Sequence, residues 1–164
     1  MKCGMIKGND SIGRRNAVLT LPFSAVSHTA ADTQAVGAAL GHYLLSHQQT
    51  DAFLALYGDL GAGKTAFVRG LASVITPGAH VCSPTYTIVN EYHAHGRTLC
   101  HLDLYRIESE DDLYSIGFYD YEGVMMAAEW CEKAPFALPP RYLRVRIDKI
   151  DEESRAITIE DISA

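Results

Sequence analysis

The sequence lacks the marks of several large classes of protein. Its four cysteines, Cys3, Cys82, Cys100 and Cys131, are scattered and form no CxxC pair, so neither a zinc ribbon nor a disulfide framework is expected. Reduced thiols in the cytosol are the simplest interpretation, and we expect a cytoplasmic protein. No apolar run approaches the roughly 18 residues of a membrane-spanning helix, so no membrane partner is expected.

Basic charge is also scarce. The chain has 14 Lys and Arg residues against 20 Asp and Glu residues, which gives a formal net charge of -6. A general basic surface that grips nucleic acid by releasing counterions is therefore excluded. We expect no binding to DNA, and we expect any contact with RNA to be made by a local patch of the surface or through another protein.

The length and composition suit one globular domain. The chain has 164 residues, 48% of them hydrophobic and 21% charged, which is enough for a proper core. Residues 1–16, rich in Gly, Asn and charge, are expected to form a flexible tail, and residues 17–164 the folded domain. Arg14 and Arg15 with the apolar stretch behind them are similar to a twin-arginine export signal, but Thr20 and Pro22 interrupt that stretch.

The order of predicted elements is that of an α/β domain. Continuous or alternating apolar runs predict strands, and apolar residues at helical spacing predict helices. The predicted strands are 17–23, 53–57, 85–93, 98–106, 124–128, 142–150 and 156–162, and the predicted helices are 30–46, 64–75 and 108–116. The continuously apolar run 53–57 is typical of a parallel sheet covered on both faces, and turns at 94–97 and 151–154 indicate antiparallel hairpins.

A glycine-rich loop joins the predicted strand 53–57 to the predicted helix 64–75. It reads Gly58-Asp59-Leu60-Gly61-Ala62-Gly63-Lys64-Thr65, the G-x4-G-K-T spacing of a phosphate-binding loop. Its glycines let backbone N–H groups turn toward phosphate oxygens, and the helix behind adds its positive dipole end. We predict a three-layer P-loop NTPase-like α/β domain with a mainly parallel central sheet and antiparallel hairpin strands.

A phosphate-binding loop of this kind works with Mg²⁺. Lys64 is expected to contact the β- and γ-phosphates and to stabilise charge, while the Thr65 hydroxyl takes one coordination position of Mg²⁺. The ion also needs a carboxylate, usually at the end of a buried strand. Asp103 and Glu129 each follow an apolar run, and either could instead be an ordinary solvated strand end.

Five ordered motifs carry a resemblance to a known family. They are the loop at 58–65, the segments 83–87 and 101–106, Gly117 with Asp120 and Tyr121, and the pair Glu129-Trp130. In order and spacing they resemble the TsaE (YjeE) family, the bacterial ATPases of tRNA threonylcarbamoyladenosine synthesis, over residues 17–162. The resemblance implies slow Mg-ATP hydrolysis in a complex with the TsaD and TsaB proteins, with tRNA met indirectly or by a local contact.

The resemblance also implies roles for single residues. Glu129 would hold Mg²⁺ with Thr65, and Asp103 would orient water or metal during hydrolysis. ATP or ADP would bind residues 58–65 and Ala66, with the stretch from His28 to Thr33 near the adenine and Arg155 as a further contact. The family usually has threonine at the position of Ala66, so nucleotide binding is expected to weaken by about 1 kcal/mol. Segments 83–87 and 101–106 resemble two switch-like segments that order around the γ-phosphate.

One cluster of side chains at the predicted hairpin and a single tryptophan each allow two interpretations. His93, His95, Cys100 and His101 could face one another as metal ligands, or they could be ordinary surface and core residues. Trp130 could stack on a base or anchor a partner protein, or it could be buried beside the sheet.

The arginines near the predicted site and at the predicted strand 142–150 also allow more than one interpretation. Arg106 could neutralise phosphate charge or pair with the acidic residues that follow it. Arg141, Arg144 and Arg146 could form a solvated strand face or contact tRNA or an acidic partner.

Two other functions fit the same loop. A small-molecule or nucleotide kinase shares it, but such kinases usually add a lid with several arginines, which are here on a predicted strand. A nucleotide-gated assembly module would use ATP binding as a signal, with incidental hydrolysis. Replacement of Asp103 by alanine separates turnover from binding.

Overall fold

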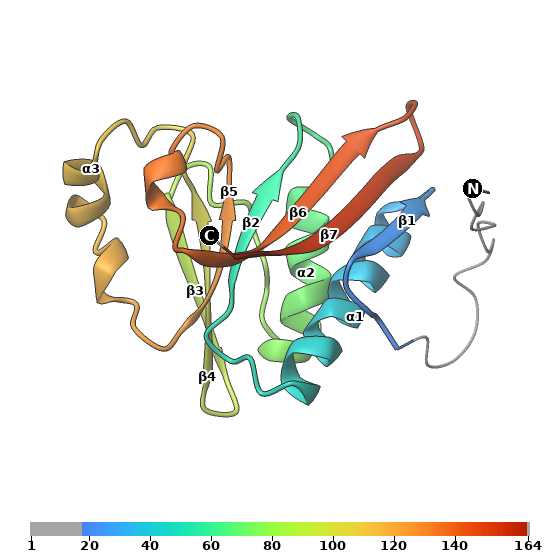
Figure 1. Ribbon diagram of the computed structural model, residues 1–164, viewed down its shortest axis with the longest axis horizontal. Coiled ribbons are helices and arrows are strands. Elements are labelled where there is room, and N and C mark those ends of the chain that lie inside the picture. Colours follow the sequence, from blue (N-terminus) through green and yellow to red (C-terminus); the bar gives the residue numbers. More distant parts are fainter. Residues whose placement is uncertain (1–17, 164) are drawn as a thin grey trace, which may run out of the picture.

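The computed structural model describes residues 18–163 and has a seven-stranded sheet at its centre (Figure 1). The strands are β1 (Phe23–Ser27), β2 (Phe53–Tyr57), β3 (Val89–Ala94), β4 (Arg97–Asp103), β5 (Met125–Glu129), β6 (Arg141–Lys149) and β7 (Arg155–Ser163). The helices are α1 (Ala30–Ser46), α2 (Lys64–Ile75) and α3 (Glu110–Ser115), with the short 3-10 helices η1 (Phe118–Asp120) and η2 (Pro135–Ala137). The predicted tail at 1–16 lies outside the described residues.

The sheet is parallel at its centre and antiparallel at both edges. Its strand order is β1-β7-β6-β2-β5-β4-β3. Strands β6, β2, β5 and β4 run parallel to one another, while β7 and β1 extend one edge and β3 the other in antiparallel pairs. The carboxyl ends of β2, β4 and β5 therefore meet at one edge of the sheet, where ligands bind in open α/β folds.

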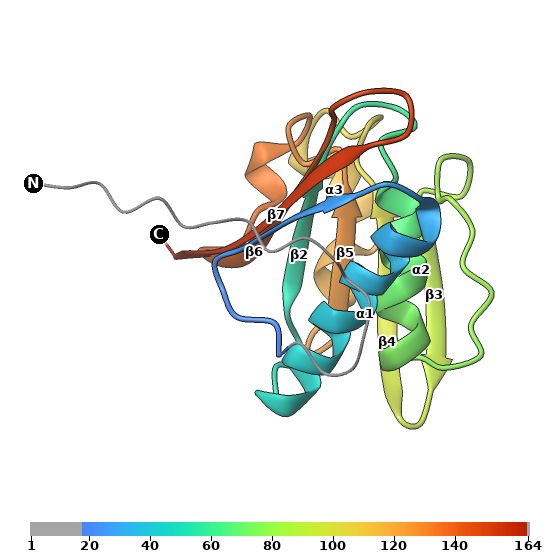
Figure 2. The same cartoon turned by 90° about the vertical axis from the view of Figure 1, so that its right-hand side faces the viewer.

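Helices cover both faces of the sheet, which confirms the predicted three-layer arrangement. Helices α1 and α2 lie side by side on one face, and α3 with η1 and η2 lies on the other (Figures 1 and 2). Alternating side chains of β2 enter different cores: Leu54 and Leu56 pack with α1 and α2, whereas Phe53 and Ala55 pack on the α3 side.

Close packing of α2 on α1 fixes the position of α2. A Cβ atom on Gly70 would collide with the backbone carbonyl of Gln34, and one on Gly37 would collide with that of Phe67. The two helices are therefore in backbone contact, which a larger side chain at either glycine would prevent. Since the phosphate-binding loop leads directly into α2, this packing also positions the loop.

The predicted helices 30–46 and 64–75 and the predicted strand 53–57 are confirmed residue for residue. Thr29 caps α1 in a capping box with Asp32, a start signal one residue before the predicted helix. In residues 18–163 no helix is both long and apolar enough to cross a membrane.

Two predicted strands are misplaced. The strand predicted at 17–23 begins instead at Phe23, since pairing with β7 starts there and the preceding Pro22 has no amide donor. The strand predicted at 85–93 begins only at Val89, because residues 85–87 form a turn and Ile88 has a φ of 67°. The β-propensity of the local sequence does not reveal where these turns end and the strands begin.

Candidate nucleotide-binding site

The phosphate-binding loop follows the carboxyl end of β2 and depends on glycine at two points. A Cβ atom on Gly58 would collide with the carbonyl oxygen of Ile147 on β6. Gly63 caps α2 with a φ of 112°, in the left-handed region that L side chains rarely adopt. The loop thus enters the α2 amino end in a conformation that leaves the first amides of the helix free for an anion.

Lys64 is the first residue of α2 and is only 5% exposed. Its Nζ atom donates to the carbonyl oxygens of Gly58 and Asp59, and it lies 4.1 Å from the centroid of the Trp130 ring. Burial lowers the pKa of Lys64, an effect that nearby carboxylates oppose, Glu129 most strongly. In this state the ammonium is therefore folded back on its own loop.

Thr65 and Glu129 come together beside Lys64. The Thr65 hydroxyl donates to Oε1 of Glu129 at 3.1 Å, across the gap between α2 and the end of β5. The same Oε1 lies 2.8 Å from Nε2 of His101 on β4. A hydroxyl and a carboxylate side by side are oxygen donors of the kind Mg²⁺ prefers, so these residues fit the ion that the loop implies.

Asp103 is the last residue of β4 and lies opposite Glu129 in the register of β4 with β5. Both residues are buried, so the interpretation of either as a solvated strand end is wrong. One Asp103 oxygen accepts from the backbone N–H of Tyr105 at 2.9 Å. The structure thus brings both predicted carboxylates to the loop edge of the sheet, and their roles stay predictions.

Thr33 on α1 and Arg155 at the start of β7 also lie next to the loop. A Cβ atom on Gly63 would lie 3.6 Å from the Thr33 methyl group. Arg155 donates through Nε to the carbonyl oxygen of Ala62 at 3.1 Å. Lys149, which the sequence did not single out, donates to the carbonyl oxygen of Leu60 at 2.9 Å. Together with Lys64 and Arg155, Lys149 is a third basic residue at the loop, and the sequence did not show that the end of β6 approaches the loop.

Arg106 links the two switch-like segments. Its guanidinium donates to the carbonyl oxygen of Thr85, an exposed residue of segment 83–87. Among residues 18–163, no ion pair includes Arg106, so it does not pair with the acidic residues of α3. Neither sequence interpretation anticipated a backbone contact 21 residues away.

Trp130 lies at the loop instead of in the core. It follows Glu129 directly, has a φ of 63° and is only partly buried. Its ring meets that of Tyr105 edge-on at 5.2 Å between centroids, in addition to its contact with Lys64. The contact of the tryptophan with the loop lysine was not visible in the sequence.

The histidines and cysteine of the β3–β4 hairpin do not gather into a metal site. His101 faces Glu129, Cys100 enters the core on the α3 side, and His93 contacts the Thr98 hydroxyl at 2.9 Å. Alternation along β4 sends Cys100 and His101 to opposite faces of the sheet. Within the described chain no group of three or more His, Cys, Asp and Glu side chains could hold a metal ion.

The three arginines of β6 form ion pairs along the sheet. Arg141 pairs with Asp161 and Arg144 with Glu160, both at 2.8 Å, while Arg146 lies 3.9 Å from Asp148. A paired strand face is the simpler of the two interpretations. Because these residues lie on a strand, they do not form the arginine-bearing lid of a kinase.

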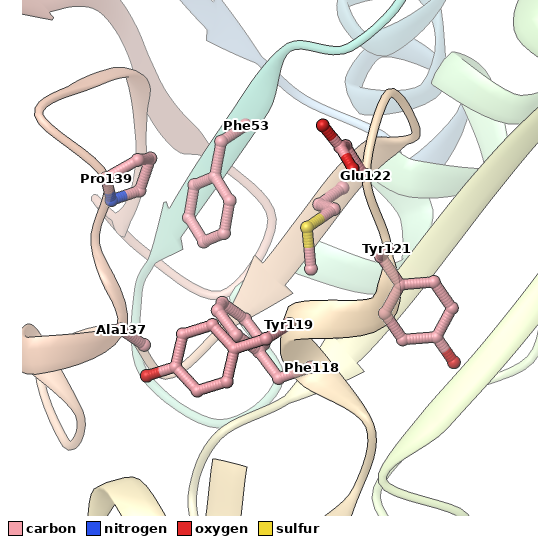
Figure 3. A pocket seen from close by; sticks show the side chains of 8 residues that line it. Phe53, Phe118, Tyr119, Tyr121, Glu122, Ala137 and Pro139 are labelled. Carbon is pink, nitrogen blue, oxygen red and sulfur yellow. The ribbon is translucent and has the colours of Figure 1, made fainter. Parts of the chain in front are cut away.

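A hollow of about 270 Å³ lies away from the loop (Figure 3). It is lined by Phe53, Phe118, Tyr119, Tyr121, Glu122, Met126, Ala137 and Pro139. Phe53 begins β2, whereas the loop follows the last residue of that strand, so the hollow is at the opposite end of β2. It is not part of the candidate site.

The strand–loop–helix with its buried lysine, set in a parallel sheet with two carboxylates at the same edge, defines a P-loop α/β protein. Residues 27–157 match the family model described as "Threonylcarbamoyl adenosine biosynthesis protein TsaE". The chain belongs to the TsaE family, which confirms the resemblance found in the sequence.

Individual relatives agree with this assignment. The chain is 34% identical over 137 residues to the tRNA threonylcarbamoyladenosine biosynthesis protein TsaE of Treponema pallidum, covering 82% of this chain and 97% of that protein. It is 39% identical over 108 residues to TsaE of Haemophilus influenzae, covering 65% and 68%. The crystal structure of Bacillus subtilis YdiB superimposes with a TM-score of 0.67 at 25% identity, covering 87% of this chain and 86% of that one.

Proposed function

We propose that this protein binds and hydrolyses Mg-ATP within the machinery that forms threonylcarbamoyladenosine in tRNA. The names of its relatives support the pathway. The observation that carries the activity is the meeting of the Thr65 hydroxyl and the Glu129 carboxylate beside the buried Lys64. These are the groups that phosphoryl transfer at a P-loop needs.

Different residues of the site have different roles in nucleotide binding and hydrolysis. The loop amides and Lys64 bind the phosphates, which requires the ammonium to leave the carbonyl oxygens of Gly58 and Asp59. Thr65 and Glu129 would hold the magnesium ion, which would supply positive charge to neutralise the phosphates during their transfer. Asp103, next to Glu129 at the strand ends, orients the attacking water.

We further propose that the TsaD and TsaB proteins complete the site and raise its activity. The loop and the segment 83–87 each expose a large apolar or aromatic side chain. Leu60 on the loop itself is 80% exposed, and Tyr86 on segment 83–87 is 92% exposed. A protein partner would cover such side chains, and covering them would exclude water from the nucleotide. On this account tRNA is met through the complex.

The alternative of a nucleotide-gated module with incidental hydrolysis is separated by Asp103→Ala. A reconstituted system with the TsaD–TsaB pair, tRNA and substrates measures modified tRNA, complex formation and Mg-ADP affinity together. We expect Asp103→Ala to stop modification while binding and assembly persist. The exposed Asp111 on α3 supplies a matched control, Asp111→Ala, which should retain all three.

Undiminished modification by Asp103→Ala would contradict a hydrolytic role and support the gated module. Absence of any effect of this protein on tRNA modification would contradict the proposed pathway itself.

A further inference from the structure

His101 is a buried side chain with only one of its two ring nitrogens satisfied. The residue is 0% exposed on β4, and its Nε2 atom lies 2.8 Å from Oε1 of Glu129. Its Nδ1 atom is buried without a hydrogen-bond partner among residues 18–163. An orphaned buried polar atom destabilises a fold and calls for an explanation. Packing alone does not supply one, since an apolar side chain would leave no orphan.

The partner of Nε2 determines which nitrogen carries the proton. A carboxylate oxygen is only an acceptor, so Nε2 must be the donor. In the neutral ring Nδ1 is then a bare acceptor. Within residues 18–163, the one hydrogen bond of the His101 ring is therefore an N–H donated to Glu129.

This hydrogen bond engages one oxygen of Glu129, and in residues 18–163 the other oxygen has no hydrogen-bond partner. Oε1 accepts from both His101 and the Thr65 hydroxyl. In the described part of the chain no hydrogen bond reaches Oε2, and Oε2 is not a buried atom without a partner. Oε2 is thus the Glu129 oxygen with no partner in this part of the chain, on a side chain that is 6% exposed.

Glu129 has a second charged neighbour in the Lys64 ammonium. Glu129 is the carboxylate that acts most strongly on the Lys64 ammonium, yet in residues 18–163 the two form no ion pair within 4.0 Å. If the Glu129 carboxylate paired with Lys64, the lysine would be less free to bind phosphate and the carboxylate less free to bind the cation. His101 is fully buried, so it contacts Glu129 from the interior of the domain.

We propose that His101 is a positioning residue, whose Nε2–H fixes the Glu129 carboxylate so that Oε2 faces the divalent cation of the nucleotide. The inference rests on the proposed Mg-nucleotide function. Hydrogen-bond partners of metal ligands typically change metal affinity by about 10–100-fold when they are removed.

The test is the gain in ADP affinity that Mg²⁺ produces, measured by calorimetry on the full chain with excess Mg²⁺ and with EDTA. His101→Gln keeps an N–H donor at the same number of bonds from Cβ as Nε2. His101→Asn places its amide where Nδ1 lies, one bond too short to reach Glu129. His101→Met removes both the donor and the orphan, and Leu102→Val is the control on the opposite face of β4.

We expect His101→Gln and Leu102→Val to keep the Mg²⁺-dependent gain within about threefold of the wild type. In His101→Asn and His101→Met the gain should fall about tenfold or more, while the affinity in EDTA stays unchanged. Thermal unfolding in the same buffers separates positioning from stability, and His101→Met should unfold no earlier than His101→Asn. Of His101→Asn and His101→Met, either one suffices if the other does not fold.

An undiminished gain in His101→Asn and His101→Met would overturn the proposal. So would equal losses with Mg²⁺ and with EDTA, or equal losses in His101→Gln and His101→Asn, because each indicates a merely structural role. If wild-type protein shows no Mg²⁺-dependent gain, both this inference and the proposed function are wrong.

Discussion

The Lys64 ammonium lies 4.1 Å from the centroid of the Trp130 ring, at the face of the chain's one tryptophan. A cation over an indole ring is favourable, and Trp is the best ring for it. The lysine that the loop assigns to phosphate is therefore held by an aromatic ring and two carbonyl oxygens. Phosphate has to draw it away from these partners, so the two residues together report on binding.

Mg-ADP should change the fluorescence of Trp130 because phosphate moves the Lys64 charge off the ring. Lys64→Met should abolish this change and weaken Mg-ADP by about 10–100-fold, the loss of a hydrogen bond to a charged group. Lys133→Met is the matched control, since Lys133 lies over Tyr105 at 5.1 Å, beside the same aromatic pair. A full fluorescence response in Lys64→Met would contradict the contact.

Lys64→Met should also unfold no earlier than the wild type when both are free of ligand at pH 7. Burial lowers the pKa of Lys64 from 10.5, so the unfolded chain holds this proton more tightly. The charged lysine therefore destabilises the fold below its lowered pKa, and this penalty fades as the pH rises toward 10.5. Thermal unfolding at pH 7 and pH 9.5 should show the variant's advantage shrinking. A variant less stable than the wild type at pH 7 would refute this sign.

Arg106→Ala should loosen segment 83–87 without unfolding the domain. Loss of the hydrogen bond to the Thr85 carbonyl removes about 1 kcal/mol of local stability, so amide exchange in this segment should quicken about fivefold. Hydrogen exchange with mass spectrometry measures it. Arg141→Ala, which breaks an ion pair on β6, should leave segment 83–87 unchanged. Equal exchange in both variants would show that Arg106 does not hold the segment.

Asp32→Ala should lower the free energy of unfolding by about 1 kcal/mol, the usual effect of losing a helix cap. The Asp32 carboxylate accepts from the backbone N–H groups of His28 and Thr29, both at 3.0 Å. These bonds lower its pKa, the one from His28 most, so its stabilisation is full above pH 3.8 and is lost as the pH falls through the lowered value. Denaturant unfolding at pH 7 and near pH 3 measures the difference. A difference that grows in acid would contradict this assignment.

The phosphate-binding loop and the elements around it could be predicted because their signals are local. Residues 53–57 are apolar throughout, and Lys64 begins a helix at the position the motif requires. Asp103 and Glu129 could be found because each ends an apolar run. The start of β1 could not, because it is decided by pairing with the distant strand β7, where Phe23 lies opposite Ile159.

Contacts between side chains of the site were beyond local signals. His101 meets Glu129 only because β4 lies beside β5 in one register, and no pattern in either strand specifies that neighbour. The approach of Trp130 to Lys64 depends in addition on the positive φ of Trp130. Such contacts depend on strand order, which the sequence motifs left open.

The central claim is that Lys64 and Glu129 serve a magnesium-dependent ATPase that partner proteins complete. The most direct measurement is the ATP hydrolysis rate of the full chain, alone and with the TsaB–TsaD pair, for the wild type, Lys64→Ala and Glu129→Ala. We predict a low rate that rises with the pair and disappears in both variants. A rate that the pair does not change, with phosphate passing instead to an added metabolite, would contradict the account and indicate a kinase.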